Sequence, residues 1–163
     1  MERQSDPSSR RSVLYVEDHP VNAMLMGALF ERRPQLRLVV ATTGEEAVCC
    51  ASGLNPLLLL VDLRLPDCHG AQLLDVLRLI PGCEDAPAVA VTADGDYDLR
   101  GTGFVELWAK PMDLDQVLRR LDALVGPAPQ PAAAAAGSPV RGDFTTRCTR
   151  WSLRTTGAES TNG

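Results

Sequence analysis

Five short apolar runs, separated by longer segments of a different periodicity, constrain the fold of this chain more than any other feature. The runs are VLYV, LRLVVA, LLLLV, AVAVT and FVELW, at residues 13–16, 36–41, 57–61, 88–92 and 104–108. Most are rich in Val and Leu, and they do not alternate cleanly between polar and apolar residues, which is the pattern of strands buried on both faces. We therefore expect an open α/β fold, in which helices cover both faces of a five-stranded parallel sheet.

The segments between the runs carry apolar residues at helical spacing, and each such face is expected to be buried. The first helix should begin near Pro20 and bury Val21, Met24, Leu25, Ala28 and Leu29. A second apolar face consists of Leu73, Leu74, Leu77 and Ile80. Capping-box spacing predicts helix starts at Thr43 and Asp113. The last helix should bury Leu114, Val117, Leu118 and Leu121.

Composition divides the chain into one domain and two flanks. We expect a disordered N-terminus at 1–12, a domain at 13–125, a Pro/Ala-rich linker at 126–139 and a disordered tail at 140–163. The domain carries 17 acidic and 9 basic side chains, a net charge of −8 within a chain total of −5. This balance argues against a nucleic-acid partner. The flanks contain no helix-turn-helix pattern, so we expect no DNA-binding output domain.

Cysteine usage and hydropathy predict a cytoplasmic protein. The five cysteines are odd in number, lack zinc-type spacing and follow no signal-peptide pattern, so we expect reduced thiols and no disulfides. The most apolar run, PLLLLV, is far too short to cross a bilayer, so we expect no membrane association.

Polar side chains follow four of the apolar runs, where the carboxyl ends of parallel strands would meet. Glu17 and Asp18 follow the first run, Asp62 the third, and Lys110, the only lysine of the chain, the fifth; Thr92 ends the fourth. Taken singly, each has an ordinary explanation as a cap, a strand end or a surface charge. Together, three converging carboxylates would repel one another unless a cation were present. Oxygen-only ligands favour Mg²⁺, which we expect at this edge.

Four segments of the chain resemble the receiver domain of two-component response regulators. They are VLYVEDHPVN (13–22), LLLLVDLRLPDCHG (57–70), AVAVTA (88–93) and WAKPMD (108–113). The resemblance covers roughly residues 13–125 and implies a flavodoxin-like fold. It also implies a phosphoryl acceptor and a bound Mg²⁺.

The resemblance assigns roles by position. It implies that Asp62 is the phosphoacceptor, that Glu17 and Asp18 bind Mg²⁺ together with Asp62, and that the backbone carbonyl of Arg64 completes the protein's ligands. Thr92 is similar to the hydroxyl that bonds the phosphoryl group, and Lys110 is similar to its charge partner. Structural positions at the site are Pro66, Gly70, Ala93 and Pro111, the last following a bond that is typically cis in the family.

Two positions depart from the family pattern. Leu107, three residues before Lys110, stands where an aromatic switch residue is common, and we expect Phe104 and Trp108 to pack the sheet rather than replace it. Lys110 follows Thr92 by only 18 positions, which predicts a shortened fourth helix. His69 occupies a position where the family usually has Asp, and we expect neither His69 nor His19 to bind metal or take part in catalysis.

The resemblance implies a receiver that takes a phosphoryl group from a phosphohistidine, on a sensor histidine kinase or a histidine phosphotransfer protein, and signals through protein–protein contacts. Such a domain catalyses its own phosphorylation and the slow hydrolysis of the resulting aspartyl phosphate. The motifs resemble free-standing receivers or those at the ends of hybrid histidine kinases. A phosphorylation-independent binding module of the same fold is the alternative. Haloacid-dehalogenase-type phosphatases fit poorly, because Arg64 stands where they need a second Asp.

Overall fold

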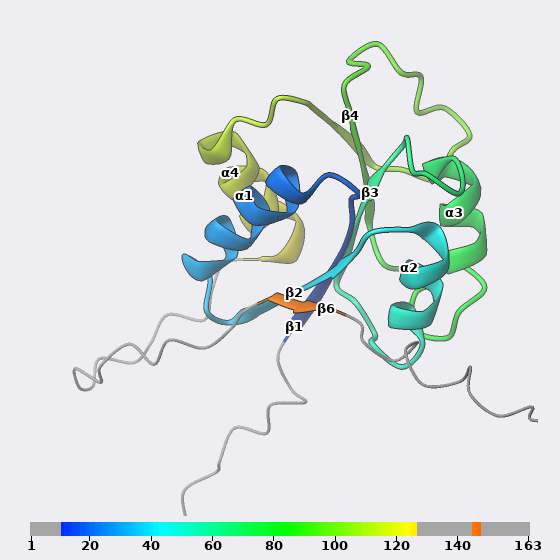
Figure 1. Ribbon diagram of the computed structural model, residues 1–163, viewed down its shortest axis with the longest axis horizontal. Coiled ribbons are helices and arrows are strands. Elements are labelled where there is room, and N and C mark those ends of the chain that lie inside the picture. Colours follow the sequence, from blue (N-terminus) through cyan, green and yellow to red (C-terminus); the bar gives the residue numbers. More distant parts are fainter. Residues whose placement is uncertain (1–10, 127–144, 148–163) are drawn as a thin grey trace, which may run out of the picture.

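The computed structural model describes residues 11–126 and 145–147, which form one parallel sheet with helices on both sides (Figure 1). The elements in chain order are β1 (Arg11–Val16), α1 (Pro20–Glu31), β2 (Leu36–Ala41), α2 (Gly44–Ala51), β3 (Leu58–Asp62), α3 (Gly70–Leu77), β4 (Ala88–Thr92), β5 (Glu106–Ala109), α4 (Leu114–Val125) and β6 (Thr145–Arg147). The strand order is β5-β4-β3-β1-β2-β6, and every pair is parallel. The predicted α/β fold is confirmed with its five expected strands, and β6 adds a sixth strand at the edge beside β2.

The sheet separates two apolar layers, because successive strand residues point to opposite faces. Val13 and Tyr15 of β1 belong to the layer that α1 and α4 cover, whereas Leu14 and Val16 belong to the layer beneath α2 and α3. Figure 1 shows these two helix pairs on opposite sides of the sheet. The strand order reverses between β1 and β3, so the carboxyl ends of these neighbouring strands border the crevice where α/β folds bind ligands.

Local signals place several helix starts correctly. Thr43 Oγ1 accepts a hydrogen bond from Glu46 N–H at 3.0 Å, and Asp113 Oδ1 accepts one from Gln116 N–H at 2.9 Å. Pro20 opens α1, where its missing N–H costs nothing. No helix in the described ranges is long and apolar enough to cross a membrane.

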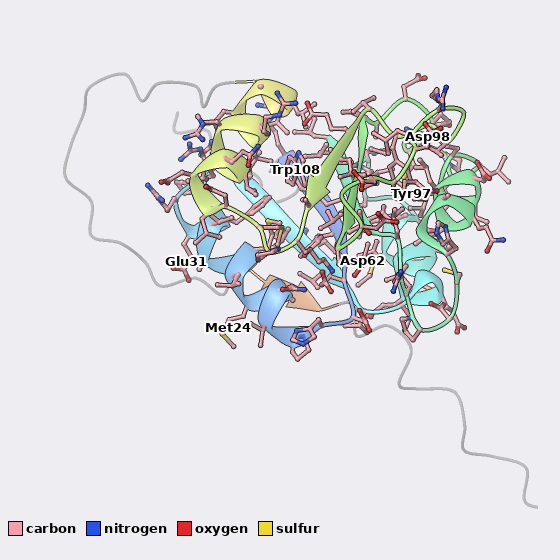
Figure 2. The ribbon with its side chains drawn as sticks, turned by 90° about the horizontal axis from the view of Figure 1, so that it is seen from above. Met24, Glu31, Asp62, Tyr97, Asp98 and Trp108 are labelled. Atoms are coloured by element: carbon pink, nitrogen blue, oxygen red, sulfur yellow. The ribbon has the colours of Figure 1, made fainter. Side chains whose placement is uncertain are left out.

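The predicted buried face of α1 is wrong except at Leu29, which is buried as expected. Val21, Met24, Leu25 and Ala28 are exposed, Met24 by 73%, and the helix buries Met26 and Phe30 beside Leu29. Figure 2 shows Met24 on the outer side of the helix. Because α1 is apolar around most of its circumference, periodicity alone does not select which face packs. Leu114, predicted to be buried in the last helix, is also 40% exposed.

The predicted short fourth helix is absent. Residues 93–105 between β4 and β5 contain only turns and bends, so the helix after β5 is α4. Asp94 and Asp98 accept hydrogen bonds from backbone N–H groups two residues later, a local pattern that competes with helix formation. Gly101 and Gly103 adopt positive φ angles of 73° and 81°, which also favour turns.

Both ends of the predicted domain differ slightly from the sequence boundaries. β1 begins at Arg11, two residues before the expected start at 13, and the Arg11 guanidinium donates to the Val125 carbonyl of α4. Thr145–Arg147 forms β6 beside β2, so the expectation of a tail without regular structure fails at these three residues. Residues 1–10, 127–144 and 148–163, which include most of the predicted linker and tail, lie outside the described residues.

Candidate functional site

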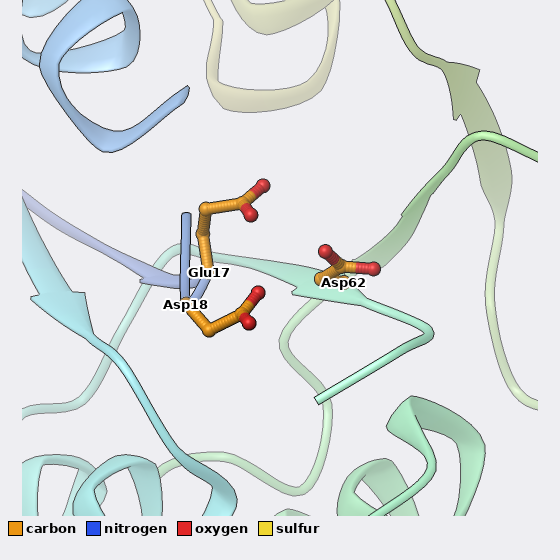
Figure 3. Close-up of side chains that lie close together, drawn as sticks. All are labelled: Glu17, Asp18 and Asp62. Carbon is orange, nitrogen blue, oxygen red and sulfur yellow. The ribbon is translucent and has the colours of Figure 1, made fainter. Parts of the chain in front are cut away.

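The acidic side chains predicted to converge do so at the carboxyl ends of β1 and β3. One carboxylate oxygen from each of Glu17, Asp18 and Asp62 lies within 4.8 Å of the others. Figure 3 shows these three side chains close together. Glu17 and Asp62 are buried, whereas Asp18 lies at the exposed rim. Three acids therefore form an oxygen cluster that opens to solvent on one side.

Lys110 lies between two of these carboxylates. Its Nζ is 2.7 Å from Glu17 Oε2 and 2.5 Å from Asp62 Oδ2, and its side chain is only 17% exposed. The Lys110 N–H donates to the Thr92 carbonyl at 2.8 Å, which extends the β4–β5 pairing into the site. The one lysine of the chain thus serves as the cation of the acidic cluster.

The pKa values of the cluster reflect burial opposed by these contacts. Burial raises the pKa of Glu17, but hydrogen bonds from Lys110 and Tyr15 and the Lys110 charge outweigh it and hold the pKa below its ordinary value. Burial and the charge of Glu17 hold the pKa of Asp62 above its ordinary value, although Lys110 opposes this shift. Burial lowers the pKa of Lys110, but its two carboxylate partners hold it above the ordinary value, so the ammonium stays charged.

Sequence analysis missed one member of this network. Tyr15 is fully buried, and its hydroxyl donates to Glu17 Oε2 at 2.9 Å. Burial and the charge of Glu17 raise the pKa of Tyr15 above its ordinary range, so the phenol remains a protonated donor. The available signal was the spacing: Tyr15 and Glu17 lie two residues apart and so share a face of β1, and a buried tyrosine hydroxyl needs a partner.

The loop after β3 is held against the strand end and against α2. The Arg64 N–H donates to Asp62 Oδ1 at 2.9 Å. A Cβ on Gly70 would lie 2.4 Å from the Asp62 carbonyl oxygen, so only glycine allows this approach. Asp67 accepts from the N–H groups of Gly44 and Glu45, at 2.9 and 3.0 Å, and thereby caps the first turn of α2. Pro66 lies within this loop, between Asp62 and Asp67.

Thr92 and Pro111 occupy the expected places beside Lys110. Thr92 is buried at the end of β4, and its hydroxyl oxygen accepts from the Asp94 N–H at 3.1 Å. Ala93 follows it at the exposed rim, and the Lys110–Pro111 bond is cis. The hydroxyl proton of Thr92 is therefore available to a ligand.

The other singled-out residues have structural positions. His69 Nδ1 accepts from Ala71 N–H at 3.2 Å and caps α3, and its ring lies 5.9 Å from that of Tyr97. The His19 N–H donates to Glu17 Oε1 at 3.1 Å. Phe104 and Trp108 are buried in opposite apolar layers, as predicted, and Leu107 is half-buried on β5.

Known proteins are similar to this chain in sequence. A family model described as the response regulator receiver domain matches residues 13–122. The signal transduction histidine-protein kinase BarA of Escherichia coli K12 is 30% identical over 110 residues, which cover 65% of this chain but 12% of BarA. The nitrate/nitrite response regulator protein NarL of the same organism is 34% identical over 68 residues, 41% of this chain and 32% of NarL. The chain thus matches only a small part of these relatives.

Solved structures share the fold. The receiver domain of sensor histidine kinase PA1611 from Pseudomonas aeruginosa PAO1, which has a magnesium ion coordinated in its active site cleft, is 28% identical with a TM-score of 0.64. The similarity covers 71% of this chain and 98% of that domain. The HemR receiver domain from Leptospira biflexa has the same identity and TM-score, over 72% of this chain and 96% of that domain.

Proposed function

This chain belongs to the receiver domain family of two-component response regulators, and from that premise we propose that Asp62 accepts a phosphoryl group from a phosphohistidine in the presence of Mg²⁺. The position of Asp62 carries the proposal. Its carboxylate is buried in an oxygen cluster at the crevice of the sheet, and Lys110 contacts one oxygen at 2.5 Å. A nucleophile, a cation and further oxygen ligands are therefore within reach of one another.

The residues at the cluster fit Mg²⁺. The three carboxylates carry one negative charge each, and Lys110 balances only one of them, which leaves two negative charges to neutralise. Among the described residues, the Asp18 carboxylate engages no hydrogen bond or ion pair, so its oxygens are free to bind a metal. Glu17, Asp18, Asp62 and the Arg64 carbonyl would hold the ion. When bound, it would neutralise charge on the phosphoryl oxygens.

The chemistry follows from the ionised carboxylate. An oxygen of Asp62 forms a bond to phosphorus while the P–N bond of the phosphohistidine breaks, and the electron pair of that bond returns to the imidazole nitrogen. No base is needed, because Asp62 carries no proton to remove. Lys110 then exchanges Asp62 Oδ2 for a phosphoryl oxygen, and the Thr92 hydroxyl donates to another. A compact ammonium suits this place better than the wide, planar guanidinium of arginine.

Receiver domains interact with histidine kinases and phosphotransfer proteins, and we infer that such proteins supply the phosphoryl group here, in the cytoplasm. The similarity to part of the histidine kinase BarA supports this kind of partner. We further infer that the phosphorylated domain signals through protein contacts, without contacting nucleic acid or a membrane. The excess of acidic over basic side chains in residues 13–125 supports the exclusion of nucleic acid.

Intact-protein mass spectrometry tests the phosphoacceptor. The full chain is incubated with Mg²⁺ and either acetyl phosphate or phosphoramidate, a small donor with a P–N bond. We expect a mass increase of one phosphoryl group, which is lost with EDTA or in Asp62→Asn and kept in Asp75→Asn, the matched change of an exposed carboxylate on α3. No adduct on the wild-type chain, or the same adduct on Asp62→Asn, would contradict the proposal.

A phosphorylation-independent binding module is the second candidate. Position 107 holds leucine in place of the common aromatic switch residue, and the connection at 93–105 contains no helix. Hydrogen exchange separates the two functions. A phosphorylated switch should change exchange at residues 93–109, whereas a constitutive module should show the same exchange before and after phosphorylation.

A further inference from the structure

Among residues 11–126, the phenol of Tyr15 is the one buried polar group next to the acidic cluster that the phosphoryl-transfer chemistry does not use. Tyr15 and Glu17 are both fully buried and lie on the same face of β1 and its extension. The distance from the Tyr15 hydroxyl to Glu17 Oε2 is 2.9 Å. The tyrosine ring is surrounded by the apolar layer beneath α1 and α4, so its position is set by packing.

The partners of Glu17 are divided unequally between its two oxygens. Oε2 accepts from the Tyr15 hydroxyl and lies 2.7 Å from Lys110 Nζ. Within the part of the chain that the structure describes, Oε1 accepts only from the backbone N–H of His19. A carboxylate has about four lone-pair positions, so the remaining one lies on Oε1. We propose that Tyr15 is a positioning residue, which fixes Glu17 through Oε2 so that Oε1 is presented to Mg²⁺.

A glutamate at this position needs such a support more than an aspartate would. Its side chain has one more rotatable bond, so placing its carboxylate costs more conformational entropy. A donor on a packed ring removes that freedom before the metal binds. Outer partners of this kind commonly change metal affinity when they are removed.

Tyr15 also holds Glu17 when the contacts of Lys110 change. This step rests on the proposed function, in which Lys110 exchanges Asp62 Oδ2 for a phosphoryl oxygen. Movement of the ammonium toward that oxygen would weaken its contact with Glu17 Oε2, and a buried carboxylate with too few donors is costly. The Tyr15 hydroxyl supplies the donor that remains, so the ligand stays in place through the transfer.

Calorimetric titration of Mg²⁺ into the metal-free full chain tests the inference. Tyr15→Phe removes one oxygen and keeps the ring, and we expect it to weaken Mg²⁺ binding about tenfold. Tyr97→Phe, at the other tyrosine of the chain, is the matched control and should bind like the wild type. In a Glu17→Asp background the shorter carboxylate no longer reaches the phenol, so Tyr15→Phe should have no further effect there.

Each result is decisive. Equal affinity of Tyr15→Phe and the wild type would overturn the inference, as would the same loss in the Glu17→Asp background, which indicates a general loosening of the fold.

Wild-type protein labelled with ¹³C at the tyrosine ζ carbon gives a test that needs no variant. The Tyr15 signal should shift with Mg²⁺ and saturate while that of Tyr97 stays constant, and an unmoved Tyr15 signal would refute the role. Absence of Mg²⁺ binding by the wild type would instead refute the cofactor of the proposed function itself.

Discussion

Replacing Lys110 by glutamine should destabilise the metal-free protein and make its stability depend strongly on Mg²⁺. The substitution leaves two buried carboxylates, Glu17 and Asp62, without their shared cation. Their nearest cluster oxygens lie within 4.8 Å, and two unit charges at that separation repel by about 3 kcal/mol with an effective dielectric constant of 20. Loss of one partner from a buried ion pair costs a similar amount, roughly 3 to 5 kcal/mol. Three remaining donors, from Tyr15, His19 and Arg64, favour the lower value.

Urea denaturation in EDTA measures this cost. We expect the free energy of unfolding of Lys110→Gln to fall by about 3 kcal/mol with an unchanged slope, and the melting temperature by roughly 10 °C for a domain of this size. Saturating Mg²⁺ should stabilise the variant more than the wild type, because the ion replaces the missing positive charge.

A matched control separates burial from ion pairing as such. The Arg100–Asp98 pair has an N–O distance of 2.6 Å, much like that of Lys110 and Asp62, but its side chains are 91% and 57% exposed. Arg100→Gln should therefore leave stability unchanged. Equal stability of Lys110→Gln and the wild type in EDTA would refute the electrostatic account of the cluster.

Substitutions at three further positions test the surrounding structure. Gly70→Ala should lower the free energy of unfolding by about 1 to 3 kcal/mol in urea, because its Cβ would lie 2.4 Å from the Asp62 carbonyl oxygen; unchanged stability would contradict the close approach. Asp67→Ala should cost about 1 kcal/mol by uncapping α2, and Asp67→Asn less, since it keeps an acceptor oxygen. The hydrogen bond and charge of Arg33 lower the pKa of Asp122, so this pair stabilises the fold above the ordinary carboxyl pKa of about 4 and is lost as pH falls below it. Asp122→Asn should therefore make the free energy of unfolding less dependent on pH in the acidic range. An unchanged pH dependence would show that the Arg33–Asp122 pair does not cause it.

Local pattern alone was enough to predict five of the six strands and the place of the candidate site. Strands buried on both faces require nearly continuous apolar runs, and the carboxyl ends of parallel strands meet at one edge. Residues such as Asp62 and Lys110, directly after two of these runs, must therefore lie near each other whatever the details of packing. The caps at Thr43 and Asp113 were equally readable, because a capping hydrogen bond spans only three residues.

Tertiary packing decided what a local pattern leaves open. Which side of α1 is buried depends on where the sheet and α4 lie, because Met24 and Met26 are equally apolar in sequence. The connection at 93–105 has no helix, since its aspartates and glycines satisfy the backbone in turns. The hydrogen bond of Tyr15 to Glu17 is local in sequence, but the second partner of the same carboxylate oxygen, Lys110, lies nearly a hundred residues away. A side chain's intrinsic preferences are encoded locally, whereas its partners are set by which distant segments the fold brings within hydrogen-bonding distance.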